Sequence, residues 1–190
     1  MIKDYGTTFK NDGINSLTTT PDNKYLFAVS SSGHLKQICL ERREEVHDYR
    51  RIHADNISCL ETTRDSKWLI TGSYDGHVKR ISIDNRQVDK DFGQVCDYSI
   101  KTMKITADGE KLFVGDWAGH LKLISLRDRQ VIKDFGKIHI FGISGIIITL
   151  DQKSFFTSSE DGILKQWSYK DNTLVRDHKQ ITGYDIFSLC

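Results

Sequence analysis

The 190-residue chain lacks the features that direct proteins to membranes, to secretion or to nucleic acid. Its 27 Lys and Arg residues balance 26 Asp and Glu, so the net charge of +1 creates no field that would attract nucleic acid or an anionic membrane. No run of about 18 apolar residues is present, and the N-terminal segment has no apolar signal-peptide core. We therefore expect a cytoplasmic protein with no nucleic-acid partner and no membrane insertion.

Residue patterns that support metal binding or catalysis are also missing. The four cysteines contain no C-x-x-C pair, although zinc sites need ligands at close spacing; they are Cys39, Cys59, Cys96 and Cys190. There is no G-x-S-x-G elbow, no Walker phosphate loop and no H-E-x-x-H motif. We expect small buried cysteines, no metal, no cofactor and no enzymatic activity.

What the sequence does contain is a repeat with a period of 43 residues. The same spacing separates five isoleucines, each of which opens a similar phrase: Ile14, Ile57, Ile100, Ile143 and Ile186. Threonine, aspartate, glycine and lysine recur in the same register; they begin with Thr20, Asp22, Gly33, Lys36 and Asp48. A period of about 40 to 45 residues made of short strands is typical of propeller blades.

Within one repeat, four short β-prone runs alternate with turns. In residues 100–142 the turns are 107–110, 118–119 and 127–129, each with Gly or Asp. The only proline, Pro21, falls in such a turn, and no segment has sustained helical periodicity. We predict an all-β fold over 1–190, with repeats at about 14–56, 57–99, 100–142 and 143–185 and partial blades at 1–13 and 186–190.

Two further columns of the repeat have plain structural interpretations. His34, His77 and His120 follow the Gly of the second turn, and each belongs to a different repeat, so we expect surface residues and no shared metal ion. The lysine column that begins with Lys36 predicts a solvated outer face that discourages edge pairing.

The repeats resemble the WD-repeat (WD40) β-propeller family. His53 and His139 stand four residues before the inner-strand isoleucine, Asp75 and Asp161 stand in the second turn, and Trp167 ends a third strand. The resemblance implies WD40-type blades of four antiparallel strands, in which these side chains and a Ser or Thr form a hydrogen-bonded network. Blade four carries all three motif types, blade two carries the His and the Asp, and blades one and three lack the network.

The family's rings close with about seven blades, whereas this chain has about four. Residues 2–6 resemble the outer-strand residues 132–136, and residues 186–189 resemble an inner strand. We therefore expect an incomplete ring: a fragment, or an arc that self-association or missing blades would complete.

The resemblance also implies a scaffold that binds proteins or peptides on its rim within a multiprotein complex. The family's contact positions correspond here to the position before the turn aspartate and the position before the inner strand: Ser31, Tyr74, Trp117 and Glu160, then Asn56, Ser99 and Gly142. Tyr74 and Trp117 would lie side by side on adjacent blades and serve as interface anchors, or each ring packs against its neighbouring blade.

Two other functions remain open from the sequence. The chain could be a purely structural segment of a larger WD-repeat protein. It could also be a phosphoinositide-binding propeller, because residues 40–44 (LERRE) are the nearest match to a paired-Arg motif, although they lack its Gly and carry acidic neighbours.

Overall fold

The computed structural model describes residue 9 and residues 12–180. These residues form strands and turns without a helix. The strands are β1 (Ile14–Thr19), β2 (Tyr25–Ser30), β3 (His34–Cys39), β4 (Glu44–Arg51), β5 (Ile57–Thr62), β6 (Trp68–Ser73), β7 (His77–Ser82), β8 (Gln87–Gln94), β9 (Ile100–Ile105), β10 (Lys111–Asp116), β11 (His120–Ser125), β12 (Val131–Lys137), β13 (Ile143–Ile148), β14 (Ser154–Ser159), β15 (Ile163–Ser168) and β16 (Leu174–Gln180).

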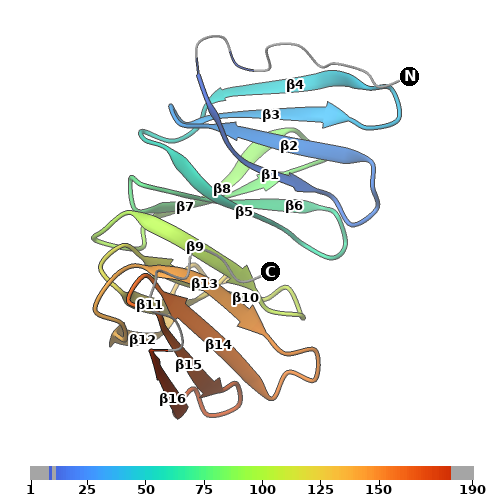
Figure 1. The fold of residues 1–190 in the computed structure, drawn as a ribbon. Coiled ribbons are helices and arrows are strands. Elements are labelled where there is room, and N and C mark those ends of the chain that lie inside the picture. Colours follow the sequence, from blue (N-terminus) through green and yellow to red (C-terminus); the bar gives the residue numbers. More distant parts are fainter. Residues whose placement is uncertain (1–8, 10–11, 181–190) are drawn as a thin grey trace. The chain divides into compact units, whose positions relative to one another are not determined.

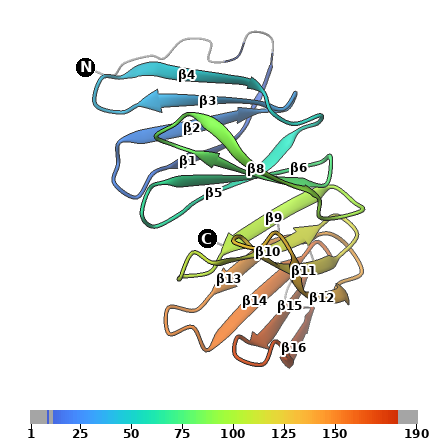
Figure 2. The same cartoon turned by 180° about the vertical axis from the view of Figure 1, so that it is seen from behind.

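The strands form four antiparallel sheets, each with four strands in chain order (Figures 1 and 2). We call β1–β4 blade 1, β5–β8 blade 2, β9–β12 blade 3 and β13–β16 blade 4. The chain divides into two compact units, 1–97 (unit 1, blades 1 and 2) and 98–190 (unit 2, blades 3 and 4). The predicted all-β fold of four-stranded propeller blades is confirmed. The predicted outer strand at 2–6 and inner strand at 186–189 lie outside the described residues.

A threonine and an aspartate build the turn between the first two strands of every blade. In blade 1 the Thr20 hydroxyl donates to the Asp22 carboxylate at 2.6 Å, and Asp22 accepts the Lys24 amide at 3.1 Å. The same two bonds recur at Thr63 and Asp65, Thr106 and Asp108, and Thr149 and Asp151. The hydroxyl of Thr20 lowers the pKa of Asp22. This explains why threonine recurs at the first position and aspartate at the second in every repeat.

The core of each unit lies between its two blades. In unit 2 it contains Phe113, Leu121, Leu123, Ile138, Ile143, Ile146, Phe155 and Trp167. Unit 1 has a corresponding cluster of Phe27, Val29, Leu35, Ile57, Leu69, Ile81 and Ile83. Phe27 and Phe113 hold the same repeat position, as do Leu35 and Leu121, because two repeats separate the clusters. Each pair of blades therefore buries one apolar face.

The lysine column departs from its prediction as a solvated face. The side chains of Lys36, Lys79 and Lys165 are only 17–19% exposed. Each ammonium group pairs with an aspartate of the fourth strand of its blade, from the repeat column that begins with Asp48. The distances are 3.7 Å to Asp48, 3.0 Å to Asp91 and 3.6 Å to Asp177. The lysine stem packs along the sheet while its charge is neutralised, so the column links the two outer strands of a blade.

Candidate interaction surface

One edge of each unit gathers the positions that the sequence marks as rim residues. At this edge the first and third strands of each blade begin and the second and fourth strands end, because the four strands are antiparallel and consecutive. In unit 2 the edge therefore contains residues 98–101, 117–120, 138–142 and 160–162, which we call the unit 2 rim. The Trp117 amide donates to the Ser99 carbonyl at 3.0 Å, which joins two of these segments.

Trp117 is the largest side chain on the unit 2 rim, and it is 44% exposed. The ammonium group of Lys101 lies 4.2 Å from its ring centroid, a cation–π contact, and also forms an ion pair with Glu160 from blade 4. Gly142 lies so close that a Cβ there would stand 3.2 Å from the Trp117 Cα. Lys101 therefore connects the indole to Glu160 of blade 4, while nearly half of Trp117 is exposed to solvent.

The turn that carries Trp117 is capped by an aspartate from a different repeat position than in blades 2 and 4. In blade 2 Asp75 accepts the His77 amide at 2.9 Å, and in blade 4 Asp161 accepts the Ile163 amide at 3.0 Å. Blade 3 has Ala118 at that position, and Asp116, two residues earlier, accepts the equivalent His120 amide at 2.9 Å. The turn therefore closes although its usual aspartate is missing.

Three more large side chains are exposed on the unit 2 rim. Tyr98 is 53% exposed and its ring stacks on that of His120 at 5.5 Å. Ile140 and Phe141 are 66% and 56% exposed, in the loop before β13. Sequence reasoning missed these residues and Lys101, although two consecutive large apolar residues in a loop were a usable signal. With Trp117 they give this rim an aromatic and aliphatic surface.

Unit 1 carries the remaining predicted rim residues. The Tyr74 amide donates to the Asn56 carbonyl at 2.9 Å, and the Asn56 side chain accepts from Asn15. The Ser31 hydroxyl donates to Asp12 at 2.7 Å. Tyr74 is half-buried, whereas Trp117 is exposed. These two rings belong to different units, so their side-by-side placement stays a prediction.

A buried hydrogen-bonded network ties the rim loops to the sheets of blades 2 and 4. In blade 4 the Thr157 hydroxyl lies 2.9 Å from His139 Nε2 and accepts the Trp167 indole N–H at 3.0 Å. His139 Nδ1 stands 3.6 Å from Asp161. In blade 2 His53 bridges Thr71 at 2.8 Å and Asp75 at 3.1 Å.

Burial sets the protonation of this network. It lowers the pKa of His53, and it lowers the pKa of His139 to about 4, in spite of the carboxylates nearby. Burial alone would raise the pKa of Asp75, but the His77 amide and His53 lower it below its ordinary value. Both imidazoles are therefore neutral at pH 7, and the network holds the rim loops in place without a buried ion pair.

The other sequence-predicted groups are dispersed. Cys39 and Cys96 are buried, Cys59 is half-buried and none of these three forms a disulfide, while Cys190 lies outside the described residues. Arg42 of the paired-Arg segment is bound to Glu44 at 2.6 Å. In the described part of the chain, no cluster of three or more His, Cys, Asp or Glu could hold a metal ion, and no helix is long and apolar enough to cross a membrane.

Comparison with known proteins agrees with this geometry. Residues 45–80 match the family model described as WD domain, G-beta repeat. Among solved structures, the chain is similar to one chain of the crystal structure of mitotic checkpoint complex, with a TM-score of 0.84 and 14% sequence identity over 95% of this chain. The match covers 55% of that chain, so the present chain spans about half of its length.

No curated protein sequence matches the chain. The structural likeness establishes the fold, and the family model identifies the repeat that contains His53 and Asp75. The matched repeat, its recurrence every 43 residues and the four four-stranded blades show that this chain has the fold of a WD40-type β-propeller and contains a WD repeat at residues 45–80.

Proposed function

We propose that this chain is a non-enzymatic scaffold that binds a protein or peptide segment on the unit 2 rim within a multiprotein complex. One observation carries the proposal: Trp117 and Phe141 stay 44% and 56% exposed, the first in a turn closed by Asp116 and the second in a loop anchored by His139. Large aromatic side chains held in a fixed position dominate protein interfaces, because they bury much area at a small entropic cost.

The surroundings of Trp117 favour binding over core packing. Lys101 and Glu160 neutralise each other next to the indole, so a partner that covers the ring does not leave either charge unpaired. The similar chain comes from a crystal structure of a complex, which is consistent with a scaffold role. We also propose a cytoplasmic location from the composition alone; a fluorescent fusion confined to another compartment would exclude it.

The test is affinity purification of the tagged chain with quantitative mass spectrometry. The double variant Trp117→Ala, Phe141→Ala should lose its captured partners by at least about tenfold, because the two removed rings together contribute on the order of 2 to 4 kcal/mol. The control is Val131→Ala, Ile132→Ala, which removes two side chains that are each 48% exposed on β12, away from the rim. Equal capture by the two double variants would refute the proposal. The single variant Tyr74→Ala tests the predicted role of unit 1 separately.

A further inference from the structure

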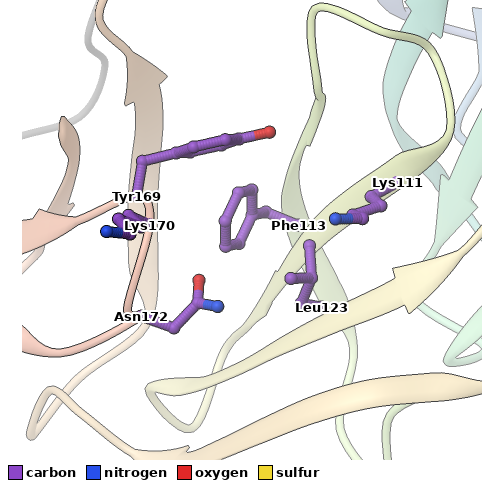
Figure 3. Close-up of a pocket in the computed structure, with 6 residues that line it drawn as sticks. All are labelled: Lys111, Phe113, Leu123, Tyr169, Lys170 and Asn172. Atoms are coloured by element: carbon purple, nitrogen blue, oxygen red, sulfur yellow. The ribbon is translucent and has the colours of Figure 1, made fainter. Parts of the chain in front are cut away.

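A concave site lies between blades 3 and 4, at the opposite strand ends from the unit 2 rim. Its volume is about 340 Å³, and its lining residues are Lys111, Phe113, Leu123, Tyr169, Lys170 and Asn172. Figure 3 shows Phe113, Leu123 and Lys111 of blade 3 facing Tyr169 and Asn172 of blade 4. We call this site the blade 3–4 pocket.

The corresponding groove of unit 1 carries different side chains. The positions of Lys111 and Asn172 correspond, two repeats earlier, to Tyr25 and Arg86. Tyr25 packs on the core of unit 1, and the Arg86 guanidinium reaches the Val46 carbonyl of blade 1 at 3.4 Å. In unit 2 a lysine replaces the ring and a shorter amide replaces the arginine. The blade 3–4 pocket therefore lacks the ring and the guanidinium that occupy these two positions in unit 1.

The lining of the blade 3–4 pocket combines an apolar floor with positive charge. Phe113 is fully buried, Leu123 is 4% exposed, and Tyr169 packs against the same core. Lys111 and Lys170 supply two cations, and none of the six lining residues is acidic. Asp108, in the turn before β10, is already bound by the Thr106 hydroxyl and the Glu110 amide.

We propose that the blade 3–4 pocket binds the apolar side chain of an acidic peptide segment. The volume is at the lower end of pockets that hold compact ligands, which suits one aromatic or branched side chain. The apolar group would lie against Phe113, Leu123 and Tyr169, while flanking carboxylates of the peptide would pair with Lys111 and Lys170. Charge complementarity selects an acidic segment over a neutral or basic one. This site is independent of the proposed role of the unit 2 rim.

The test measures fluorescence anisotropy of labelled, end-blocked peptides with the full chain. The probe is Asp-Glu-Phe-Glu-Asp, and the comparison peptides replace Phe by Ala or replace the acidic residues by Lys. We expect the probe to bind at least about tenfold more tightly than either comparison peptide, because the Ala peptide lacks the buried ring and the Lys peptide lacks the two charge pairs. Equal binding of the Ala peptide would overturn the proposal, because it would show only a cationic surface.

Asn172→Arg separates pocket occupancy from charge. Arg43, Arg86 and Arg129 hold the same turn position with φ of 55–60°, and Asn172 has φ of 54°, so the backbone accepts arginine there. If charge alone governed binding, the added cation would strengthen it. If the apolar side chain enters the pocket, the arginine fills the space and weakens binding by about tenfold; unchanged or tighter binding would overturn the proposal.

Three further variants complete the test. Lys170→Gln should weaken probe binding several-fold and reduce its salt dependence. Lys24→Gln removes an exposed lysine from unit 1 and should bind as the unaltered chain does; loss of binding in this control would also count against the pocket. The variant Trp117→Ala, Phe141→Ala should retain probe binding, so failure of the rim proposal and failure of the pocket proposal are distinguishable.

Discussion

The stability of unit 2 should fall between pH 6.5 and pH 4 because of one buried histidine. The side chain of His139 is fully buried, its Nε2 atom is bonded to Thr157, and its Nδ1 atom has no hydrogen-bond partner. Burial lowers its pKa to about 4, whereas an exposed histidine has a pKa of about 6.5. The unfolded chain therefore binds more protons than the folded chain between these two values, and acid favours unfolding in that window.

The size of the effect follows from the two pKa values. One pKa unit corresponds to about 1.4 kcal/mol, so the full loss below pH 4 is on the order of 3 kcal/mol. By pH 5 about 2 kcal/mol of it has already been lost. That is a large share of the free energy of unfolding of a typical small domain.

Urea unfolding at pH 7 and pH 5 measures this loss, with tryptophan fluorescence as the signal. His139→Gln keeps a group that can bond to Thr157 but does not titrate, so its stability should fall by about 2 kcal/mol less between the two pH values. His34→Gln, the same change at a side chain that is 40% exposed, is the control for the substitution itself. Aspartates with lowered pKa titrate at lower pH and affect all three proteins alike.

An NMR titration of the imidazole protons provides the direct check. If the His139 ring titrates near pH 6.5 in the folded chain, the reasoning fails, since burial would then not disfavour its charged form. The reasoning also fails if the unaltered chain and His139→Gln lose the same free energy on acidification.

Three other substitutions test local features of the blades, each by urea unfolding at pH 7. Gly119→Ala should lower the free energy of unfolding by more than about 3 kcal/mol, since the glycine has φ +88° and a Cβ there would overlap the His139 carbonyl. Gly109→Ala, with φ +74° and open space around it, should lower it by only about 1 kcal/mol. Equal losses for the two variants would contradict the packing argument. Thr63→Val should cost about 1 to 3 kcal/mol, because Asp65 and the Trp68 amide lose their partner; a neutral result would show that the Thr–Asp turn is not stabilising. Trp167→Phe should lower the free energy of unfolding by about 1 to 2 kcal/mol, because Thr157 loses the indole N–H. An unchanged free energy of unfolding would contradict a stabilising network.

The repeat allowed the blades to be predicted because each of its columns performs a local task. Thr63 and Asp65 close a turn of a few residues, and Ile57 begins an inner strand and is buried. Such roles depend on neighbours within one blade, so the same residue type returns every 43 residues and becomes visible in a single sequence. The strands of a blade and their order could therefore be predicted from the residues of that repeat alone.

The exposure of the lysine column could not be predicted from the repeat. Alternation within a strand indicated that Lys79 points away from the core, which suggested a solvated face. The partner, Asp91, lies on the next strand, and the pairing of the two columns depends on the register between β7 and β8. A sequence pattern gives the period of each column but not which columns meet across a sheet.

The candidate sites break the repeat, and this distinguishes them from the structural columns. Lys101 replaces Asn15 and Ser58, Lys111 replaces Tyr25 and Trp68, and Asn172 replaces an arginine that the other three blades share. Packing and turn roles must recur in every blade, whereas a partner contacts particular blades only. A departure from the repeat alone marks many positions, including turns such as that of Asp116. It points to a binding site only where the structure brings several departures together around one exposed ring, as at Trp117, or around one pocket, as at Phe113.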